Sequence, residues 1–228
     1  MMTIQAAEVL RSCDVIVGYQ VYVDLVKEHF EGREFLTTPM KKEVERCELA
    51  FAKAAEGKSV AMISSGDAGI YGMAGLMFEI GVKYPGVEVE VIPGITAASS
   101  GAACLGAPLI HDFAVISLSD LMTPWEKIEA RIQKAAEADF SMVLYNPSSR
   151  KRADYLQRAC DLMLEILPPD RICGTVENIG REGMHYETCT LAELRDKKVN
   201  MFTTVFIGNA GTRRLGEKMV TPRGYSWK

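Results

Sequence analysis

Short runs of β-forming residues alternate with longer helical patterns along the whole of this 228-residue chain. Gly, Pro or Asp bounds most of the runs, and such alternation is typical of an α/β protein built on a largely parallel sheet. The predicted strands are 14–17, 59–64, 87–92, 113–118, 140–145, 171–177 and 203–207. The predicted helices are 3–12, 41–56, 73–82, 96–105, 124–138, 152–167 and 191–196.

The best candidate for a hinge divides the chain into two halves of similar size. Gly106, Ala107 and Pro108 interrupt both the helical and the strand patterns. We therefore expect an N-terminal α/β domain over residues 1–108 and a C-terminal α/β domain over residues 109–228.

Charge and hydropathy narrow the class of partner. Apolar residues make up 48% of the chain, enough for a substantial core, and the formal net charge of -4 comes from scattered acids and bases. No basic stripe indicates nucleic acid or a membrane surface. Residues 91–110 carry no charge, but Gly, Ala, Ser and Pro fill this stretch, unlike a spanning helix. The expected partner is a small molecule.

The six cysteines lie far apart in the sequence, without the close pairs or the Cys/His spacings of a metal site. No signal peptide is recognised at the start of the chain. We therefore expect no bound metal and interpret all six as the reduced thiols of a cytoplasmic protein.

A glycine-rich loop follows the predicted strand 59–64, with glycines at 66, 69, 72 and 75. Ligands bind at the carboxyl ends of strands in α/β sheets, where glycine lets the main chain approach them. Gly72 and Gly75 are interpreted as helix-packing positions, whereas Gly66 and Asp67 at the strand tip indicate a nucleotide-like pocket. The patterns expected for ATP and NAD are absent.

Pro93, Gly94 and Thr96 repeat this arrangement after the next predicted strand. Thr96 alone is better explained as a helix cap than as a ligand contact. Two neighbouring uncharged loops nevertheless favour a shared cofactor site.

Titratable and hydroxyl side chains are concentrated around the predicted strand 113–118. His111 and Asp112 precede it, and Ser117, Ser119 and Asp120 follow its apolar run. The histidine is as consistent with a buried, hydrogen-bonded residue as with a general base.

A capping box is predicted directly downstream, with Thr123 as the cap, Pro124 in the first helical position and Glu126 completing the box. These three residues are therefore interpreted as structural.

Three consecutive cations, Arg150, Lys151 and Arg152, follow the strand-end residues Tyr145 to Ser149. Cations at the start of a helix oppose its dipole, so an anionic substrate is a plausible reason for them. A solvated run of surface charge is the commoner explanation.

Together these motifs resemble the tetrapyrrole (class III) S-adenosylmethionine-dependent methyltransferases over essentially the whole chain. The residues that carry the resemblance are Gly66-Asp67, Pro93-Gly94-Ile95-Thr96, Ile116 to Asp120, Tyr145-Asn146-Pro147 and Val220 to Tyr225. The first two motifs are general to the family. The segment from His111 to Trp125 and the loop after Tyr145 resemble, more specifically, the family members that contract the tetrapyrrole ring.

The resemblance implies a two-domain fold with a mainly parallel N-terminal sheet, a mixed C-terminal sheet, a cofactor cleft between the domains and a homodimer. It also implies methylation of carbon 17 of precorrin-3B with ring contraction in cobalamin biosynthesis. The cofactor would be S-adenosylmethionine and the substrate a tetrapyrrole. The alternatives are the same reaction on cobalt-factor III and a non-catalytic binding homologue.

By motif position, the resemblance assigns cofactor contacts to particular residues, and the chemistry of the implied reaction suggests acids or bases and substrate contacts among the others. The expected cofactor-binding residues are Ser65, Gly66, Asp67, Ile70, Thr96, Ala97, Asn146, Ile179, Gly180, Thr203 and Thr204. The candidate acids or bases are His111, Asp112 and Asp120. The candidate substrate contacts are Ser117, Ser119, Arg150, Lys151, Arg152 and Arg181.

The start of the chain departs from the family pattern. Family members open with a strand and a Gly-x-Gly-x-Gly-Asp loop, then a Leu-Thr pair and a helix, and residues 2–7 match only this last part. We therefore expect the first strand and its glycine loop to be missing from this sequence.

Overall fold

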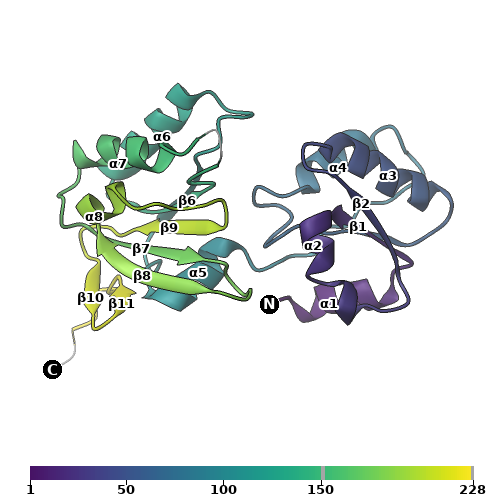
Figure 1. The fold of residues 1–228 in the computed structure, drawn as a ribbon, viewed down its shortest axis with the longest axis horizontal. Helices are drawn as coiled ribbons and strands as arrows, with labels where there is room; N and C mark the ends of the chain where they lie inside the picture. Colours follow the sequence, from purple (N-terminus) through teal and green to yellow (C-terminus); the bar gives the residue numbers. More distant parts are fainter. Residues whose placement is uncertain (150–151, 227–228) are drawn as a thin grey trace. The chain divides into compact units, whose positions relative to one another are not determined.

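The computed structural model describes residues 1–149 and 152–226, and it divides the chain into two compact units. The first unit, Met1–Thr96, runs from purple to blue-teal in Figure 1, and the second unit begins at Ala97. The division falls upstream of the predicted boundary at residue 108. The prediction failed because Gly106 and Ala107 form a strand that pairs with Met219 and Val220 of the second unit.

The N-terminal unit has a parallel sheet of three strands in the order β2-β1-β3. Its strands are β1 (Val15–Tyr19), β2 (Glu34–Thr38) and β3 (Val60–Met62). The first and third confirm the predicted strands 14–17 and 59–64. The sequence prediction missed β2, which is half-exposed along most of its length.

Helices cover both faces of this sheet. They are α1 (Ile4–Ser12), α2 (Gln20–Asp24), the 3₁₀ helix η1 (Lys27–His29), α3 (Glu43–Ala55) and α4 (Ala74–Gly81). Leu10 of α1 packs with Ile16 on one face, whereas Ala50 of α3 packs with Val15 and Val17 on the other. This alternation is the two-residue period of a strand buried on both faces.

The prediction of a strand at residues 87–92 is wrong for this structure. In the described part of the chain, this segment pairs with no strand, and its residues alternate only partly between half-buried and exposed. Val87 and Val89 still pack against the cluster of Cys47, Phe51 and Ile80. The segment thus has the side-chain packing of a strand without its hydrogen-bonded ladder.

The C-terminal unit contains a five-stranded mixed sheet in the order β5-β6-β9-β7-β8. Its strands are β5 (Phe113–Ser117), β6 (Ser141–Tyr145), β7 (Ile172–Glu177), β8 (His185–Thr190) and β9 (Thr203–Ile207). Only β5 and β6 are parallel, and the other neighbours are antiparallel. A smaller sheet joins β10 (Arg213–Leu215), β11 (Lys218–Val220) and β4 (Gly106–Ala107).

Four helices pack on the five-stranded sheet. They are α5 (Ala97–Leu105), α6 (Trp125–Glu137), α7 (Tyr155–Leu164) and α8 (Leu191–Arg195). Ile128 and Ile132 of α6 lie one helical turn apart and belong to the largest apolar cluster, together with Met163 of α7. On the other face, α5 packs closely because Gly101 lies against the ring of Phe206.

The predicted capping box at Thr123 did not form. Helix α6 begins at Trp125, its N-cap is Pro124, and no side-chain cap bond to this residue is found among the described residues. A well-formed capping box occurs instead at Thr190, whose hydroxyl accepts from the Glu193 amide while the Glu193 carboxylate accepts from the Thr190 amide.

The cysteines are free thiols, and all but the half-buried Cys104 are buried. Burial raises the pKa of Cys47 and of Cys189 to about 11, and that of Cys160 to about 12. These thiols are therefore packing residues rather than nucleophiles. In the described residues, no helix is long and apolar enough to span a membrane.

Candidate active site

Two loops at the carboxyl edge of the N-terminal sheet are tied together by one carboxylate. Asp67 Oδ1 accepts a hydrogen bond from the Gly69 amide at 2.8 Å, and its Oδ2 accepts one from the Gly94 amide at 2.8 Å. Gly94 lies so close to the first loop that an added Cβ would overlap the carbonyl oxygen of Gly66. Gly66 itself has a φ of 78°, in the region that favours glycine.

The other predicted cofactor residues of this unit lie beside this loop pair. Ser65 and Ile70 are exposed at the tip of the first loop, and Thr96 is half-buried directly before α5. The loop itself is compact, since a Cβ at Gly72 would come within 2.6 Å of the Ala68 carbonyl oxygen. The packing role predicted for Gly75 is wrong, because a Cβ placed there would have no described atom within 4 Å other than its chain neighbours and the backbone of its own helix.

A second group of predicted residues gathers at one edge of the C-terminal sheet. Ser117 and Tyr145 are paired in the register of β5 and β6, and the Asn146 amide nitrogen donates to Ser117 Oγ at 2.9 Å. The Ser117 Oγ also accepts from the Ser119 amide at 3.2 Å. Asn146 has a φ of 55°, a conformation that asparagine tolerates better than most residues.

Strands β7 and β9 bring further predicted residues to the same edge. Strand β9 is antiparallel to β6 and β7, so Thr203 and Thr204 lie beside Glu177 and Val176 at the carboxyl end of β7. Ile179 and Gly180 follow directly, and Gly180 has a φ of 69°. Ala97 begins α5, whose Ala98 amide donates to the Tyr145 hydroxyl at 2.7 Å. These predicted cofactor residues therefore lie near one edge of the C-terminal sheet.

The three candidate acids or bases are not brought together. His111 and Asp112 precede β5, whereas Asp120 follows it, and a five-residue strand spans about 16 Å. His111 Nε2 is 3.0 Å from the carbonyl oxygen of Pro222, and both are exposed. The structure therefore favours a role for His111 away from the Ser117–Asn146 edge.

Asp120 is held in a clamp. Its Oδ1 pairs with Arg152 Nε at 2.5 Å, and its Oδ2 accepts from the Tyr155 hydroxyl at 2.7 Å. The Tyr155 hydroxyl bond and then the Arg152 charge lower the pKa of Asp120, and the same bond raises the pKa of Tyr155. Both oxygens are engaged, which suits a positioning role better than proton transfer.

Replacing Asp120 with asparagine is expected to lower the pKa of Tyr155 toward its ordinary value of about 10, because the accepting carboxylate is lost. Ultraviolet difference titration of tyrosine measures this shift. Because the pKa of Asp120 is lowered in the folded chain, the clamp stabilises the fold above the unfolded pKa of about 3.9. This contribution is lost as the pH falls through the lower folded value.

Asp161→Asn is the matched control, since Asp161 makes an exposed ion pair with Arg195 at 2.6 Å. The control is expected to leave the Tyr155 titration unchanged. An unchanged titration in the Asp120 variant would refute the clamp in solution.

Two of the four predicted substrate cations have observed partners. Arg152 is committed to Asp120, and the Arg181 guanidinium lies 5.1 Å from the ring centre of Phe202, which restricts its orientation. Arg150 and Lys151 lie outside the described residues.

The family is settled by comparison with known proteins. The family model described as Tetrapyrrole (Corrin/Porphyrin) Methylases matches residues 1–195, most of the chain. The chain belongs to this family. It is a methyltransferase with the α/β tetrapyrrole methylase fold, as the resemblance predicted.

Similar tetrapyrrole methylases include a protein of Salmonella typhimurium named probable cobalt-factor III C(17)-methyltransferase. It is 46% identical over 227 residues, which cover 99% of this chain and 94% of the relative. A cobalt-factor III methyltransferase of Priestia megaterium is 43% identical, with 100% of this chain covering 43% of that longer protein. The crystal structure of the methyltransferase CobJ superposes with a TM-score of 0.88 at 36% identity, covering 96% of this chain and 93% of the other.

Sequence reasoning missed the hydrogen bonds that Tyr145 and Tyr155 make to residues of the candidate site. Tyr145 was identified only as part of a strand-end motif, yet its hydroxyl joins β6 to the start of α5. Tyr155 carried no motif, and its contact with Asp120 spans 35 positions in the sequence. A tyrosine at the start of a helix gives no signal of a partner so far away.

Proposed function

We propose that this chain transfers a methyl group from S-adenosylmethionine to carbon 17 of cobalt-factor III, with ring contraction, in cobalamin synthesis. The observation that carries the proposal is the 46% identity to a relative of that name over nearly the full length of both chains. Precorrin-3B, the metal-free substrate implied by the sequence motifs, is the second candidate. The segment from His111 to Trp125 supports it equally, because the resemblance that this segment carries is to the reaction and does not separate a metal-free from a cobalt-containing ring.

The loop pair at Gly66 and Gly94 fits the proposed cofactor. Its side chains are mostly small apart from the exposed Ile70 and Tyr71. The carboxylate of Asp67 already accepts two amide hydrogen bonds. No lysine that would repel a sulfonium lies in residues 64–75 or 93–98. S-adenosylmethionine would supply a methyl group on sulfur, activated for attack by a carbon nucleophile. The remaining proposed contacts are Ser65, Ile70, Thr96, Ala97, Asn146, Ile179, Gly180, Thr203 and Thr204.

The work of this chain's own residues is mainly to align the reactants and exclude water. Ser117 and Ser119, which we assign to the edge of the macrocycle, are joined through Ser117 Oγ, which also accepts a hydrogen bond from the proposed cofactor contact Asn146. Asp120 is proposed as a positioning residue that fixes the loop after β5 through Arg152 and Tyr155. His111 and Asp112 remain candidates for proton transfer. They would act without Asp120, which lies at the other end of β5.

Arg181 is the proposed partner of a substrate carboxylate, because a guanidinium binds a carboxylate through two parallel hydrogen bonds. Arg181→Gln is expected to raise the KM for the tetrapyrrole about 10-fold with little change in kcat, and this loss should shrink at high salt. A fall in kcat at constant KM would contradict a binding role.

The test of the function is single-turnover transfer of a labelled methyl group to cobalt-factor III and to precorrin-3B, in parallel. Faster transfer to cobalt-factor III is expected, with a product whose mass and spectrum show a contracted ring. Faster transfer to precorrin-3B would establish the second candidate. Calorimetric titration with S-adenosylmethionine tests the non-catalytic alternative, since cofactor binding without transfer to either substrate would support it.

The assembly and location of the enzyme are separate proposals. We propose a cytoplasmic homodimer, as the family resemblance implies. Sedimentation equilibrium tests the dimer, and fractionation of the source cells tests the location.

A further inference from the structure

Two neighbouring apolar side chains project from the loop 118–124, which joins β5 to α6 in the C-terminal unit. Leu121 is 65% exposed and Met122 is 95% exposed. Burial of side chains of this size stabilises a fold, and single apolar residues left in water are common on protein surfaces. An adjacent pair this exposed, on one loop tip, indicates a contact surface.

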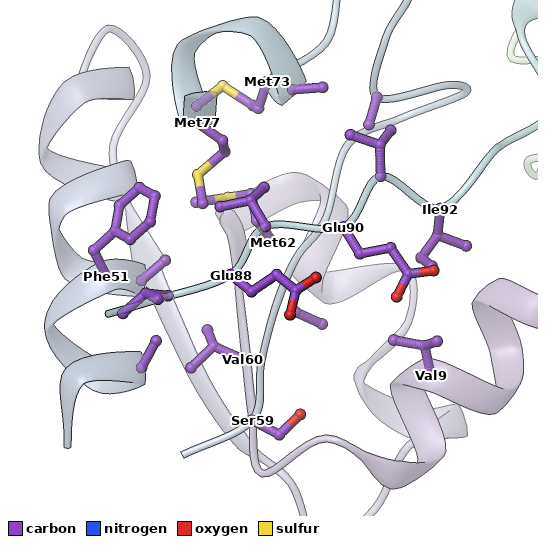
Figure 2. A pocket seen from close by; sticks show the side chains of 18 of the residues that line it. Val9, Phe51, Ser59, Val60, Met62, Met73, Met77, Glu88, Glu90 and Ile92 are labelled. Carbon is purple, nitrogen blue, oxygen red and sulfur yellow. The ribbon is translucent and has the colours of Figure 1, made fainter. Parts of the chain in front are cut away.

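Other methionines of this chain lie against apolar surroundings. Met62, Met73 and Met77 line a pocket of about 530 Å³ in the N-terminal unit, as Figure 2 shows. Met163 of the C-terminal unit is fully buried. Met122, by contrast, is exposed along nearly its whole side chain, so packing among the described residues does not explain its position.

The part of the loop before the exposed pair is held by contacts to the rest of the C-terminal unit. Leu118 is fully buried, and its amide donates to the Tyr145 carbonyl oxygen at 2.9 Å. Asp120 is held by Arg152 and by the Tyr155 hydroxyl. The main chain that leads to Leu121 is therefore fixed on both sides of Ser119.

The part of the loop after the exposed pair is held by an aromatic stack at the start of α6. Trp125 is buried, and its ring centre lies 4.4 Å from that of Tyr155. The Arg158 guanidinium lies 4.1 Å from the ring centre of Trp125, whose indole N–H donates to Glu129. Tyr155 thus contacts both Asp120 and the first residue of α6. The exposed pair stands on a loop that is fixed before any ligand binds.

We propose that Leu121 and Met122 form an apolar platform for one face of the tetrapyrrole macrocycle. The proposal rests on the proposed function and names a part of its substrate site. A tetrapyrrole ring has apolar faces, whereas its carboxylates lie at its edge. Methionine suits such a face, because its polarisable thioether adapts to the shape of a ring and makes favourable contacts with π-systems. A loop that is already ordered also limits the entropy lost on binding.

The place of the pair favours the macrocycle as its occupant. Ser117 and Ser119, which we assign to the edge of the macrocycle, lie directly upstream, and the Ser119 amide bonds to Ser117 Oγ at 3.2 Å. Only Asp120 separates Ser119 from Leu121, and its carboxylate is committed to the clamp. One short segment therefore offers hydroxyls for the polar edge of the ring and apolar side chains for its face.

The test combines Leu121→Asn with Met122→Gln, polar residues of similar size, and measures methyl transfer to cobalt-factor III. The KM for the tetrapyrrole is expected to rise about 10-fold or more, with kcat changed by less than about 2-fold. This loss should persist at high salt, because an apolar contact, unlike the one proposed for Arg181, is not screened. The melting temperature is expected to stay unchanged, since both replaced side chains are exposed. Met122→Leu keeps the apolar surface and is expected to retain the KM of the unmodified chain.

Leu215→Asn is the matched control, because Leu215 is 56% exposed in β10 and belongs to no proposed site. The control is expected to leave the KM unchanged. An unchanged KM in the double variant would overturn the proposal. A lower melting temperature of the double variant would also overturn it, since another part of the chain would then cover the pair. Conversion of a dimer to a monomer in sedimentation would instead assign the pair to a contact between copies.

Failure of the proposed function can be told apart from failure of the platform. Equilibrium binding of cobalt-factor III, followed by quenching of tryptophan fluorescence, tests the platform even where no methyl group is transferred. Equal Kd values for the unmodified chain and the double variant would overturn the platform alone. Absence of binding to the unmodified chain would overturn both.

Discussion

Gly94→Ala is expected to weaken binding of S-adenosylmethionine by about 100-fold or more, equivalent to about 2.7 kcal/mol, and to abolish detectable methyl transfer. A Cβ at this position would overlap the carbonyl oxygen of Gly66 and lie 3.0 Å from Asp67 Cα. Both contacts are main chain, and Asp67 holds the Gly94 amide in place, so neither loop can retreat alone. Calorimetric titration with the cofactor measures the affinity, and thermal unfolding measures the overpacking cost of about 1–3 kcal/mol.

Gly75→Ala is the matched control for this prediction. It adds the same methyl group to a glycine of the same unit, in helix α4, where no described atom beyond its chain neighbours and the backbone of its own helix lies within 4 Å. The control is expected to leave cofactor affinity unchanged and to stabilise the helix slightly. A Gly94 variant that binds the cofactor as tightly as the Gly75 variant would exclude the loop pair from the cofactor site.

Elements with a strong local pattern were predictable from the sequence. Helix α6 was found because Ile128 and Ile132 mark a buried stripe, and β6 was found because Ser141 to Leu144 form a buried run. The half-exposed strands β2 and β8 were missed. Their polar residues, such as Glu34 and His185, make an edge strand resemble a loop when no neighbour is known.

The segment 87–92 shows the limit of pattern alone. Its valines alternate with glutamates as in a half-buried strand, and Val87 and Val89 do pack on α3 and α4. A strand also needs a neighbour that bonds to its main chain, and local sequence carries no record of one.

The candidate site was predictable as a set of strand ends but not as a set of contacts. Gly66 and Gly94 were identified as candidates because glycine after a strand indicates a ligand-binding edge, and Asn146 was assigned by the family resemblance. The split between His111 and Asp120 was not foreseen, since residues that bracket a strand are near in sequence and far apart in space. The bridge that Asp67 makes between the two loops also could not be foreseen, because it depends on the Gly94 amide, 27 positions away.

Asp67→Asn is expected to lower the free energy of unfolding of the N-terminal unit by about 1–3 kcal/mol and cofactor affinity by at least about 10-fold. The carboxylate accepts from the Gly69 amide on one oxygen and from the Gly94 amide on the other. An asparagine of the same shape has one oxygen and one NH₂ group. In either orientation, one backbone N–H must therefore face another donor. Thermal unfolding and calorimetric titration with S-adenosylmethionine measure the two losses.

Asp14→Asn separates this effect from the loss of a negative charge. Asp14 Oδ2 accepts a hydrogen bond from the Ser59 amide at 2.8 Å, and an asparagine oxygen can accept the same bond. The control should therefore change stability by less than about 0.5 kcal/mol and leave cofactor affinity unaltered. Equal losses in the two variants would mean that charge, rather than the paired amides, holds the loops. In that case the Asp67 bridge would not be what fixes Gly94 against Gly66.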